Sequence, residues 1–203
     1  MAKDDFGHVD SLPEEIRDIF MWLSQEVANL TQKWRFYLDL FGRPESSSVL
    51  ERASSVGFRI MEESLRIDMT MTICRLADRV NGGRNDNLSF AKLADYYVSD
   101  SGLQAAVKRF ADACEPVVKS RNKRVGHNDL STKLRPHESM LPAFGRIEID
   151  LIITSAKEAL NYVSQTKADH TLMFDMMETG GERLVHWLRV GLATNERFTA
   201  EEG

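Results

Sequence analysis

The chain has 203 residues, of which 42% are hydrophobic and 28% charged, and it carries only five prolines and 12 glycines. This composition is ordinary for a globular domain that buries a core without disulfides or metals. The sequence contains no stretch near the roughly 20 apolar residues of a membrane span, and residues 1–10 are too polar for a secretory signal. We therefore expect a cytoplasmic protein that does not enter a membrane.

The first half of the chain predicts two long helices. Ser11 and Glu14 form a capping-box start, and the apolar repeat then runs to about Phe41. A glycine and a proline end that helix, and a second helix extends from residue 46 to about residue 79. The short turn between them favours an antiparallel pair. The inward positions of the second helix are expected at Val49, Ala53, Val56, Ile60, Leu65, Met69, Ile73 and Leu76.

The second half predicts shorter helices at residues 88–98, from 101 into the basic stretch, at 143–165, at 169–177 and at 182–192. Asn87 or Ser89 is expected to cap the first of these, and Pro116 to kink or restart the second. The stripe after Ser101 comprises Leu103, Val107, Phe110, Cys114 and Val117. The stripe of residues 143–165 comprises Ile147, Leu151, Ile152, Ala156, Leu160 and Val163.

The fold class that follows is all-α, an antiparallel helical bundle of about six to seven helices with no sheet. We expect a flexible N-terminus at 1–10, a single helical domain at 11–192 and a flexible tail at 193–203. Cys74 and Cys114 are expected to be buried thiols rather than a disulfide. Trp22, Trp34 and Trp187 are expected to anchor the core or an interface.

One stretch, residues 119–129, differs from the apolar periodicity around it. It reads Lys-Ser-Arg-Asn-Lys-Arg-Val-Gly-His-Asn-Asp, with four cations and one apolar side chain. Residues 108–135 hold eight Lys/Arg and three Asp/Glu, which gives +5, and because the whole chain carries −5 the remainder carries −10. A basic patch on an acidic body attracts a polyanion to one place, although a solvated charged face would look the same by charge alone.

Arg121 and His127 are the residues of this stretch best suited to chemistry. Six positions correspond to about 600° on an ideal helix, so the two side chains would not share a face. They reach one substrate either if the backbone leaves the helix at Gly126 or if two copies of the chain face each other across a two-fold axis.

This pair suits cleavage of an RNA phosphodiester. The imidazole of His127 titrates near neutrality and can move a proton at the 2′-hydroxyl or the leaving 5′-oxygen. The guanidinium of Arg121 matches a phosphate on which negative charge builds up. Neighbouring phosphates are assigned to Lys119, Lys123 and Arg124, and support of the imidazole or phosphate to Asn122, Asn128 and Asp129. His127, Asp129 and His137 match no standard metal site, so we expect neither a metal nor another cofactor.

The segment Arg121–His127 resembles the Arg-polar-x(4)-His signature of HEPN domains, and its continuation through Asn128 and Asp129 resembles the AbiU2-like branch. Residues 34–42 and 73–78 are similar to the ends of that branch's first and second helices, and residues 87–89 to the start of its next helix. Position 79 departs from the pattern, because Arg79 stands where a proline is expected.

The resemblance implies a homodimeric helical bundle with metal-independent endoribonuclease activity in phage defence or a toxin–antitoxin setting. By position it assigns catalysis to Arg121 and His127, with Asn122 as the polar neighbour, RNA as the substrate, and an antitoxin or regulatory protein as a possible partner. Arg75 and Asp78, three apart on one helix, form either a plain ion pair or support for the cleft. The alternative function is a non-catalytic helical module that binds a nucleotide, RNA or a partner protein through the patch Lys119–Arg124; a plain dimeric scaffold is the third.

Overall fold

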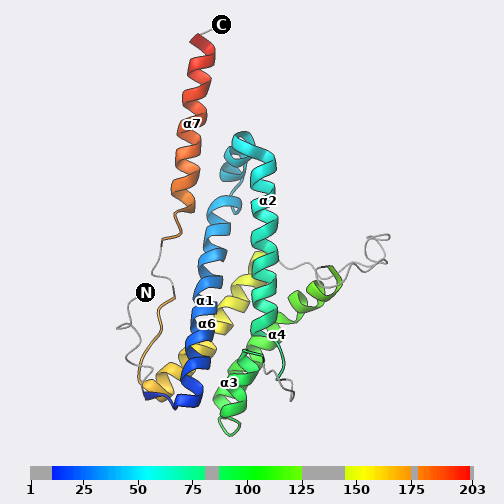
Figure 1. Cartoon of the computed structure of the whole chain (residues 1–203), viewed down its shortest axis with the longest axis vertical. Helices are drawn as coiled ribbons and strands as arrows, with labels where there is room; N and C mark the ends of the chain where they lie inside the picture. The colour runs from blue at the N-terminus through cyan, green and yellow to red at the C-terminus, as the bar shows by residue number, and fades with distance from the viewer. Residues whose placement is uncertain (1–10, 81–86, 125–144, 175–177, 202–203) are drawn as a thin grey trace. The chain divides into compact units, whose positions relative to one another are not determined.

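Helices account for nearly all of the chain that can be described (Figure 1). The structure, a computed structural model, describes residues 11–80, 87–124, 145–174 and 178–201. Within these residues lie the helices α1 (Glu14–Phe41), α2 (Pro44–Leu76), α3 (Phe90–Tyr96), α4 (Ser101–Arg124), α6 (Arg146–Ala168) and α7 (Gly181–Glu201). The same residues contain no strand, so the predicted all-α class is confirmed.

The chain divides into two compact units. The first comprises Met1–Leu30 and Thr70–Phe174, and the second comprises Thr31–Met69 and Asp175–Gly203. Both α1 and α2 contribute one part to each unit. The predicted domain boundaries near residues 11 and 192 stay predictions.

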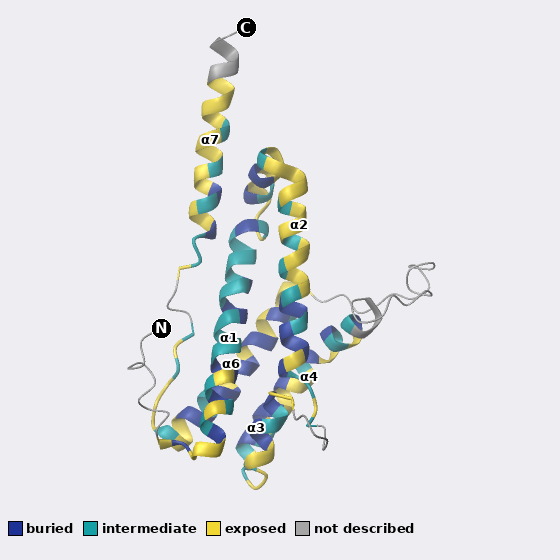
Figure 2. Cartoon of the chain, in the orientation of Figure 1, coloured by how far each residue is buried: buried dark blue, intermediate teal, exposed yellow. Residues whose placement is uncertain are grey.

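The core of the first unit forms around α4, which packs along α6 and is also contacted by α3 (Figure 1). The stripe predicted for α4 is buried throughout: Leu103, Val107, Phe110, Cys114 and Val117. Phe110 packs on Phe90 of α3 with 4.4 Å between ring centroids. The buried positions recur every three or four residues along α4, so one face of this helix is in the core and the other is in solvent (Figure 2).

The apolar stripe of α6 is only partly as predicted. Ile152, Ala156, Leu160 and Val163 are buried, but Ile147 is 80% exposed and Leu151 is 56% exposed. Ile149 and Ile153 are buried in their place. The helix begins with apolar side chains on more than one face, and packing against α4 selects the face that is buried.

In the second unit, α1 and α2 form the predicted antiparallel pair. The Lys33 ammonium lies 2.5 Å from the Asp68 carboxylate, and the Tyr37 hydroxyl donates to Glu62 at 2.9 Å. The partner number falls as the α1 number rises, which is the order that antiparallel helices require. Leu40 of α1, Val49 and Leu50 of α2 and Val185 of α7 form the buried cluster of this unit.

The prediction that Val56 and Ile60 of α2 face inward is wrong, because these side chains are 59% and 58% exposed. Ser54 has non-helical backbone angles (φ −168°, ψ 86°), which interrupts the helix between Val49 and Val56. After this interruption the helical phase changes, and Phe58 packs against the core cluster instead. A periodicity extended across Ser54 therefore selects the wrong face.

Several helix ends also differ from the sequence expectation. The helix does not restart at Pro116, since α4 continues through it with Cys114 and Val117 buried on either side. The helical turns predicted at 169–177 are not found in the described residues 169–174. There Asp169 has a left-handed backbone (φ 47°) and ends α6, and the His170 amide donates to the Ser164 carbonyl at 3.2 Å. Finally, α7 continues to Glu201 instead of ending near residue 192.

The cysteines and one tryptophan are buried, whereas the other two tryptophans are exposed. Cys74 and Cys114 are both buried free thiols, as predicted. Trp34 is 7% exposed and belongs to the core, whereas Trp22 and Trp187 are 60% and 63% exposed. None of the helices in the described residues is both long and apolar enough to cross a membrane.

Candidate functional site

Arg121 is the last residue of α4 whose side chain the structure describes, and it is half-buried. The α4 stripe reaches this end of the helix, because Val117 is fully buried and Ser120 is 4% exposed. The Arg121 Nε atom is buried and has no hydrogen-bond partner among the described residues. A buried guanidinium nitrogen without a partner costs free energy, so this end of α4 has an unsatisfied donor.

The positive charge of Arg121 on α4 lies near the Cys74 thiol on α2 and influences its pKa. Burial raises the pKa of Cys74, and the hydrogen bond and positive charge of Arg121 oppose that increase only in part. Burial also raises the pKa of Cys114, and Cys74 adds to that increase because the two thiols lie near each other. Both thiols are therefore neutral at physiological pH, so the thiol near Arg121 does not add a negative charge there.

Arg75 and Asp78, considered from the sequence as a pair, have other partners. Arg75 donates to Glu26 of α1 at 3.3 Å and to Thr72 at 3.1 Å. Asp78 accepts from the Asn87 side chain at 3.4 Å, and its charge contributes to the raised pKa of Cys74. Asp78 thus lies in the electrostatic neighbourhood of Cys74, whereas Arg75 is directed to α1.

The structure describes some of the remaining predicted site residues in full, some by their backbone only, and some not at all. Lys119 is exposed and forms an ion pair with Glu115, one turn earlier on α4, at 2.7 Å. The backbones of Asn122, Lys123 and Arg124 belong to α4, while their side chains lie outside what the structure describes. His127, Asn128 and Asp129 lie wholly outside the described residues, so the predicted pairing of Arg121 with His127 stays a prediction.

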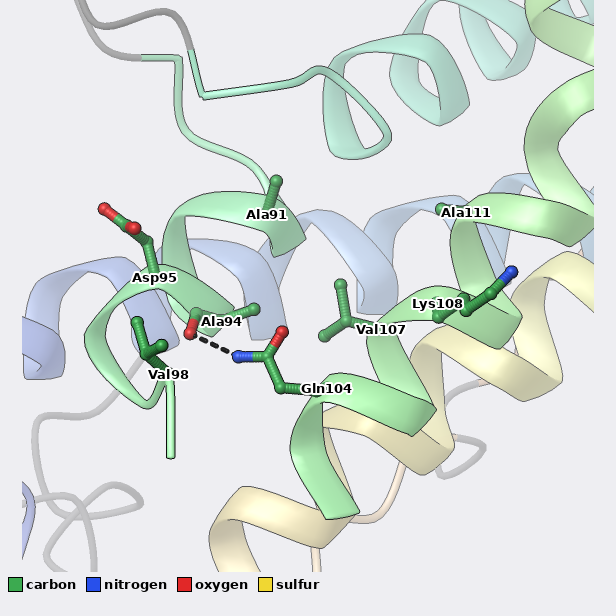
Figure 3. A pocket seen from close by; sticks show the side chains of 8 residues that line it. All are labelled: Ala91, Ala94, Asp95, Val98, Gln104, Val107, Lys108 and Ala111. Carbon is green, nitrogen blue, oxygen red and sulfur yellow. Dashed lines mark hydrogen bonds between the residues drawn. The ribbon is translucent and has the colours of Figure 1, made fainter. Parts of the chain in front are cut away.

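A hollow of about 400 Å³ lies between α3 and α4 (Figure 3). Its lining is mostly small and apolar: Ala91, Ala94, Val98, Val107 and Ala111, with Asp95, Gln104 and Lys108 as the polar members. Gln104 donates to the Ala94 and Tyr97 carbonyls at 2.8 and 3.2 Å, and Lys108 pairs with Asp112 at 2.7 Å. The hollow is on the N-terminal half of α4, with its last lining residue about 15 Å along the helix from Arg121.

A second hollow, of about 550 Å³, belongs to the other unit. It is lined by Arg35, Asp39, Glu178, Thr179, Gly180, Glu182 and Arg183. Thr179 donates to Asp39, Arg43 pairs with Glu182 at 3.2 Å, and Arg183 lies 3.9 Å from Glu178. Its lining includes three acidic and two basic side chains, so it does not concentrate one sign of charge.

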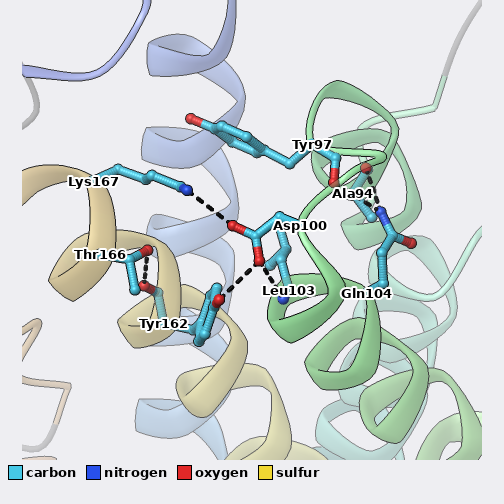
Figure 4. Close-up of polar contacts among 8 residues, drawn as sticks. All are labelled: Ala94, Tyr97, Asp100, Leu103, Gln104, Tyr162, Thr166 and Lys167. Carbon is cyan, nitrogen blue, oxygen red and sulfur yellow. Dashed lines mark hydrogen bonds and ion pairs between the residues drawn. The ribbon is translucent and has the colours of Figure 1, made fainter.

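The N-terminal end of α4 carries a polar cluster centred on Asp100 (Figure 4). Its carboxylate accepts from the Tyr162 hydroxyl at 2.8 Å, from the Lys167 ammonium at 2.9 Å and from the Leu103 amide at 3.1 Å. These hydrogen bonds, led by the one from Lys167, hold the pKa of Asp100 far below its usual range. With its acceptors occupied, this carboxylate ties α4 to α6 and caps the first turn of α4.

In the described part of the chain, no group of three or more His, Cys, Asp or Glu residues is placed to hold a metal ion. His127, Asp129 and His137, the ligands considered from the sequence, lie outside that part.

Cys74 is the residue near Arg121 that sequence reasoning did not assign to the site. It lies beside Ile73 on the apolar side of α2, which predicts burial and nothing more. A single sequence gives no signal that a thiol on α2 and an arginine 47 positions later lie near each other.

The fold and the arginine at the end of α4 define an all-α protein with a half-buried cationic site. The family model HEPN_AbiU2, described as AbiU2, matches residues 13–185. The chain therefore belongs to the AbiU2 branch of the HEPN superfamily. No curated protein and no solved structure matches the chain.

Proposed function

We propose that this protein is a metal-independent endoribonuclease in which Arg121 and His127 act on one scissile phosphate. Membership of the HEPN_AbiU2 family supports the proposal. The observation that carries it is the state of Arg121: a half-buried guanidinium near a neutral thiol, with a buried Nε that has no hydrogen-bond partner among the described residues. A cation held in this way keeps its charge for an anionic substrate.

The chemistry follows from the two side chains. The His127 imidazole accepts the proton of the ribose 2′-hydroxyl, and the 2′-oxygen forms a bond to phosphorus. The bond from phosphorus to the 5′-oxygen breaks, and that oxygen takes up a proton. The products are a 2′,3′-cyclic phosphate and a free 5′-hydroxyl. The Arg121 guanidinium stabilises the negative charge that develops on the non-bridging oxygens, while Lys119, Lys123 and Arg124 hold flanking phosphates and Asn122, Asn128 and Asp129 support the pair.

A homodimer completes this proposal, because a second copy would bring another basic stretch to a shared cleft. Exposed apolar side chains in the first unit support it: Ile147 and Leu151, one turn apart on α6, and Trp22 on α1. We expect a dimer mass in light scattering at micromolar concentration. A monomer mass under those conditions contradicts the shared cleft.

The activity is tested with a labelled RNA in EDTA. The wild-type chain is expected to release fragments with 2′,3′-cyclic phosphate ends, and His127→Ala and Arg121→Ala to lower the rate by at least about 100-fold with unchanged circular dichroism. The matched controls are His186→Ala, an exposed histidine beside Trp187, and Arg109→Ala, an exposed α4 arginine near Glu158. Cleavage retained in His127→Ala rejects its role. RNA binding without cleavage by the wild-type chain supports the non-catalytic module instead.

The biological setting belongs to the same proposal. We infer phage defence or a toxin–antitoxin pair, with an antitoxin or regulatory protein that restrains the nuclease. Expression in a bacterial host is expected to arrest growth, and the His127→Ala variant to relieve the arrest. Equal toxicity of the two forms contradicts this setting.

A further inference from the structure

The part of α2 that follows Ser54 turns one side towards α1. Glu62 accepts a hydrogen bond from the Tyr37 hydroxyl of α1, and Asp68 accepts one from the Lys33 ammonium of the same helix. These two carboxylates therefore mark the inner side of α2, and the residues about half a turn away from them form its outer side.

The outer side of α2 carries three exposed apolar side chains in one row (Figure 2). Val56, Ile60 and Ile67 are 59%, 58% and 42% exposed. They are separated by four and seven positions, which keeps them within about 40° of one another on a regular helix. Glu63 stands between the two isoleucines, so the row advances by four, three and four residues. This alternating spacing is the one by which a helix packs along a second helix.

Positive charges line one edge of this row. Arg59 and Arg66 each directly precede an isoleucine of the row, and both are exposed. They share an edge because seven positions are nearly two helical turns. The other edge holds Gly57 and Ser64, which are small and uncharged. We call the row and its cationic edge the α2 outer face; it comprises Val56, Arg59, Ile60, Glu63, Arg66 and Ile67.

A second copy of the chain fits this face poorly. In a parallel pair equal positions meet, so Glu63 would oppose the same glutamate of the other copy within the row. In an antiparallel pair the same edges meet, so Arg59 and Arg66 of the two copies would oppose each other. Like charges that face each other across an interface disfavour the pairing. The face therefore favours a partner of different sequence.

We propose that the α2 outer face binds an amphipathic helix of a partner protein, whose apolar side chains cover the row and whose acidic side chains meet Arg59 and Arg66. Recognition of an amphipathic helix through anchors three and four residues apart is a general mode of binding. A basic side chain of the partner opposite Glu63 fixes the register. The face is defined without reference to RNA, so its test holds whether or not the chain cleaves RNA.

The probe is a synthetic peptide of about three heptads, with leucines spaced alternately by three and four residues. One lysine among the leucines meets Glu63, and glutamates line both edges, where they also keep the peptide from pairing with itself. The matched basic peptide has lysines in place of those glutamates. Fluorescence anisotropy with the full chain is expected to give an at least about tenfold lower Kd for the acidic peptide, with a difference that narrows as salt rises. Equal binding of the two peptides overturns the proposal. So does absence of binding, which also covers the case in which another part of the chain occupies the face.

Two substitutions separate the apolar row from its charged edge. Ile60→Gln removes the middle of the row and is expected to weaken binding of the acidic peptide about tenfold. Arg59→Glu reverses a charge on the edge and is expected to reduce the preference for the acidic peptide by at least about fivefold. Val190→Gln and Arg189→Glu, at exposed positions of α7, are the matched controls and are expected to change neither affinity. Circular dichroism is expected to be unchanged in all four variants, because the positions are exposed. Equal losses in the variants and their controls overturn the proposal.

Two further measurements distinguish the other occupants. Ile60→Gln is expected to leave the mass in light scattering unchanged, and a lower mass shows that a second copy occupies the face, which overturns the proposal. A single-stranded RNA is expected not to displace the acidic peptide. Displacement that Arg59→Glu abolishes assigns the face to RNA and overturns the proposal as well.

Discussion

The charged side chains at the two ends of α4 differ in how many hydrogen-bond partners they have. At the N-terminal end, Asp100 accepts hydrogen bonds from Tyr162, Lys167 and the Leu103 amide, and so it is saturated with partners. At the C-terminal end, Arg121 has a neutral thiol and a buried Nε with no described partner. A fully partnered charge fixes structure, and an under-partnered charge is available to a ligand. The Asp100 cluster with Tyr162 and Lys167, here called the clamp, therefore lies at one end of α4, and the candidate site lies at the other.

One polar group next to the clamp, the Tyr97 hydroxyl, costs free energy because it is buried. The Tyr97 hydroxyl is buried with no hydrogen-bond partner among the described residues, and burial raises the pKa of Tyr97. The Lys167 ammonium lies 5.2 Å from the centroid of the Tyr97 ring, so a cation–π contact covers the ring face. The clamp thus holds its cation with both the Asp100 carboxylate and an aromatic face.

The largest expected effect comes from the apolar middle of α4, on which both ends depend. Phe110 is fully buried against Phe90. Phe110→Ala removes this contact and leaves a cavity, so we expect a loss of about 3–5 kcal/mol in the free energy of unfolding, measured with denaturant. Leu151→Ala is the control, because Leu151 is 56% exposed and should change stability far less. Similar losses in the two variants contradict the core assignment.

A second variant breaks the clamp by steric overlap. A Cβ atom at Gly102 would lie 2.2 Å from the Tyr162 hydroxyl, which bonds to Asp100. Gly102→Ala is therefore expected to destabilise the protein by about 1–3 kcal/mol, as overpacking does. The matched control is Gly191→Ala on α7, where an added Cβ meets no atom within 4 Å. That variant is expected to stabilise the helix by up to about 1 kcal/mol. Thermal unfolding of both variants checks the contrast, and a stabilised Gly102→Ala rejects it.

A third variant separates the charge of the clamp from its shape. Because the pKa of Asp100 is lowered in the folded protein, its charge stabilises the fold fully above the unfolded-state pKa of about 3.9. This contribution is lost as pH falls towards the folded-state pKa. Asp100→Asn keeps a capping side chain but no charge, so its Tm should lie below that of the wild type at pH 7. The gap should narrow below about pH 4. A gap that is independent of pH contradicts a role for the charge, and Asp112→Asn, in an exposed pair with Lys108, serves as the control.

The smallest expected effect on stability is at the Arg121 end of α4, where Lys119 can be replaced. Lys119 is exposed and pairs with Glu115 on the same helix, so Lys119→Ala should change stability by less than about 0.5 kcal/mol. If Lys119 holds a phosphate of RNA, the salt dependence of binding should fall by about one unit of slope. Fluorescence anisotropy at several salt concentrations measures that slope. An unchanged slope removes Lys119 from the phosphate-binding set and leaves Arg121 unaffected.

Much of the frame could be predicted from the sequence, since amphipathic periodicity depends on residues three and four positions apart. The α4 stripe from Leu103 to Val117, the antiparallel α1–α2 pair and the Ser89 cap are each confirmed. The resemblance carried by the stretch at Arg121 and by three short helix-end segments also placed the chain in the family that matches residues 13–185.

Only the tertiary structure decided which of several apolar faces are buried and which polar groups meet. The non-helical Ser54 rotates Val56 and Ile60 to the surface, and α4 selects Ile149 and Ile153 of α6 over Ile147. Neither the exposure of these α2 residues nor the buried face of α6 can be predicted from the apolar periodicity of the helix alone. The hydrogen bond of Tyr162 with Asp100 joins residues 62 positions apart, and Arg121 lies near Cys74, 47 positions before it. Such contacts arise from helix packing, because local sequence fixes the direction of a side chain along its own helix but not the neighbour that it meets.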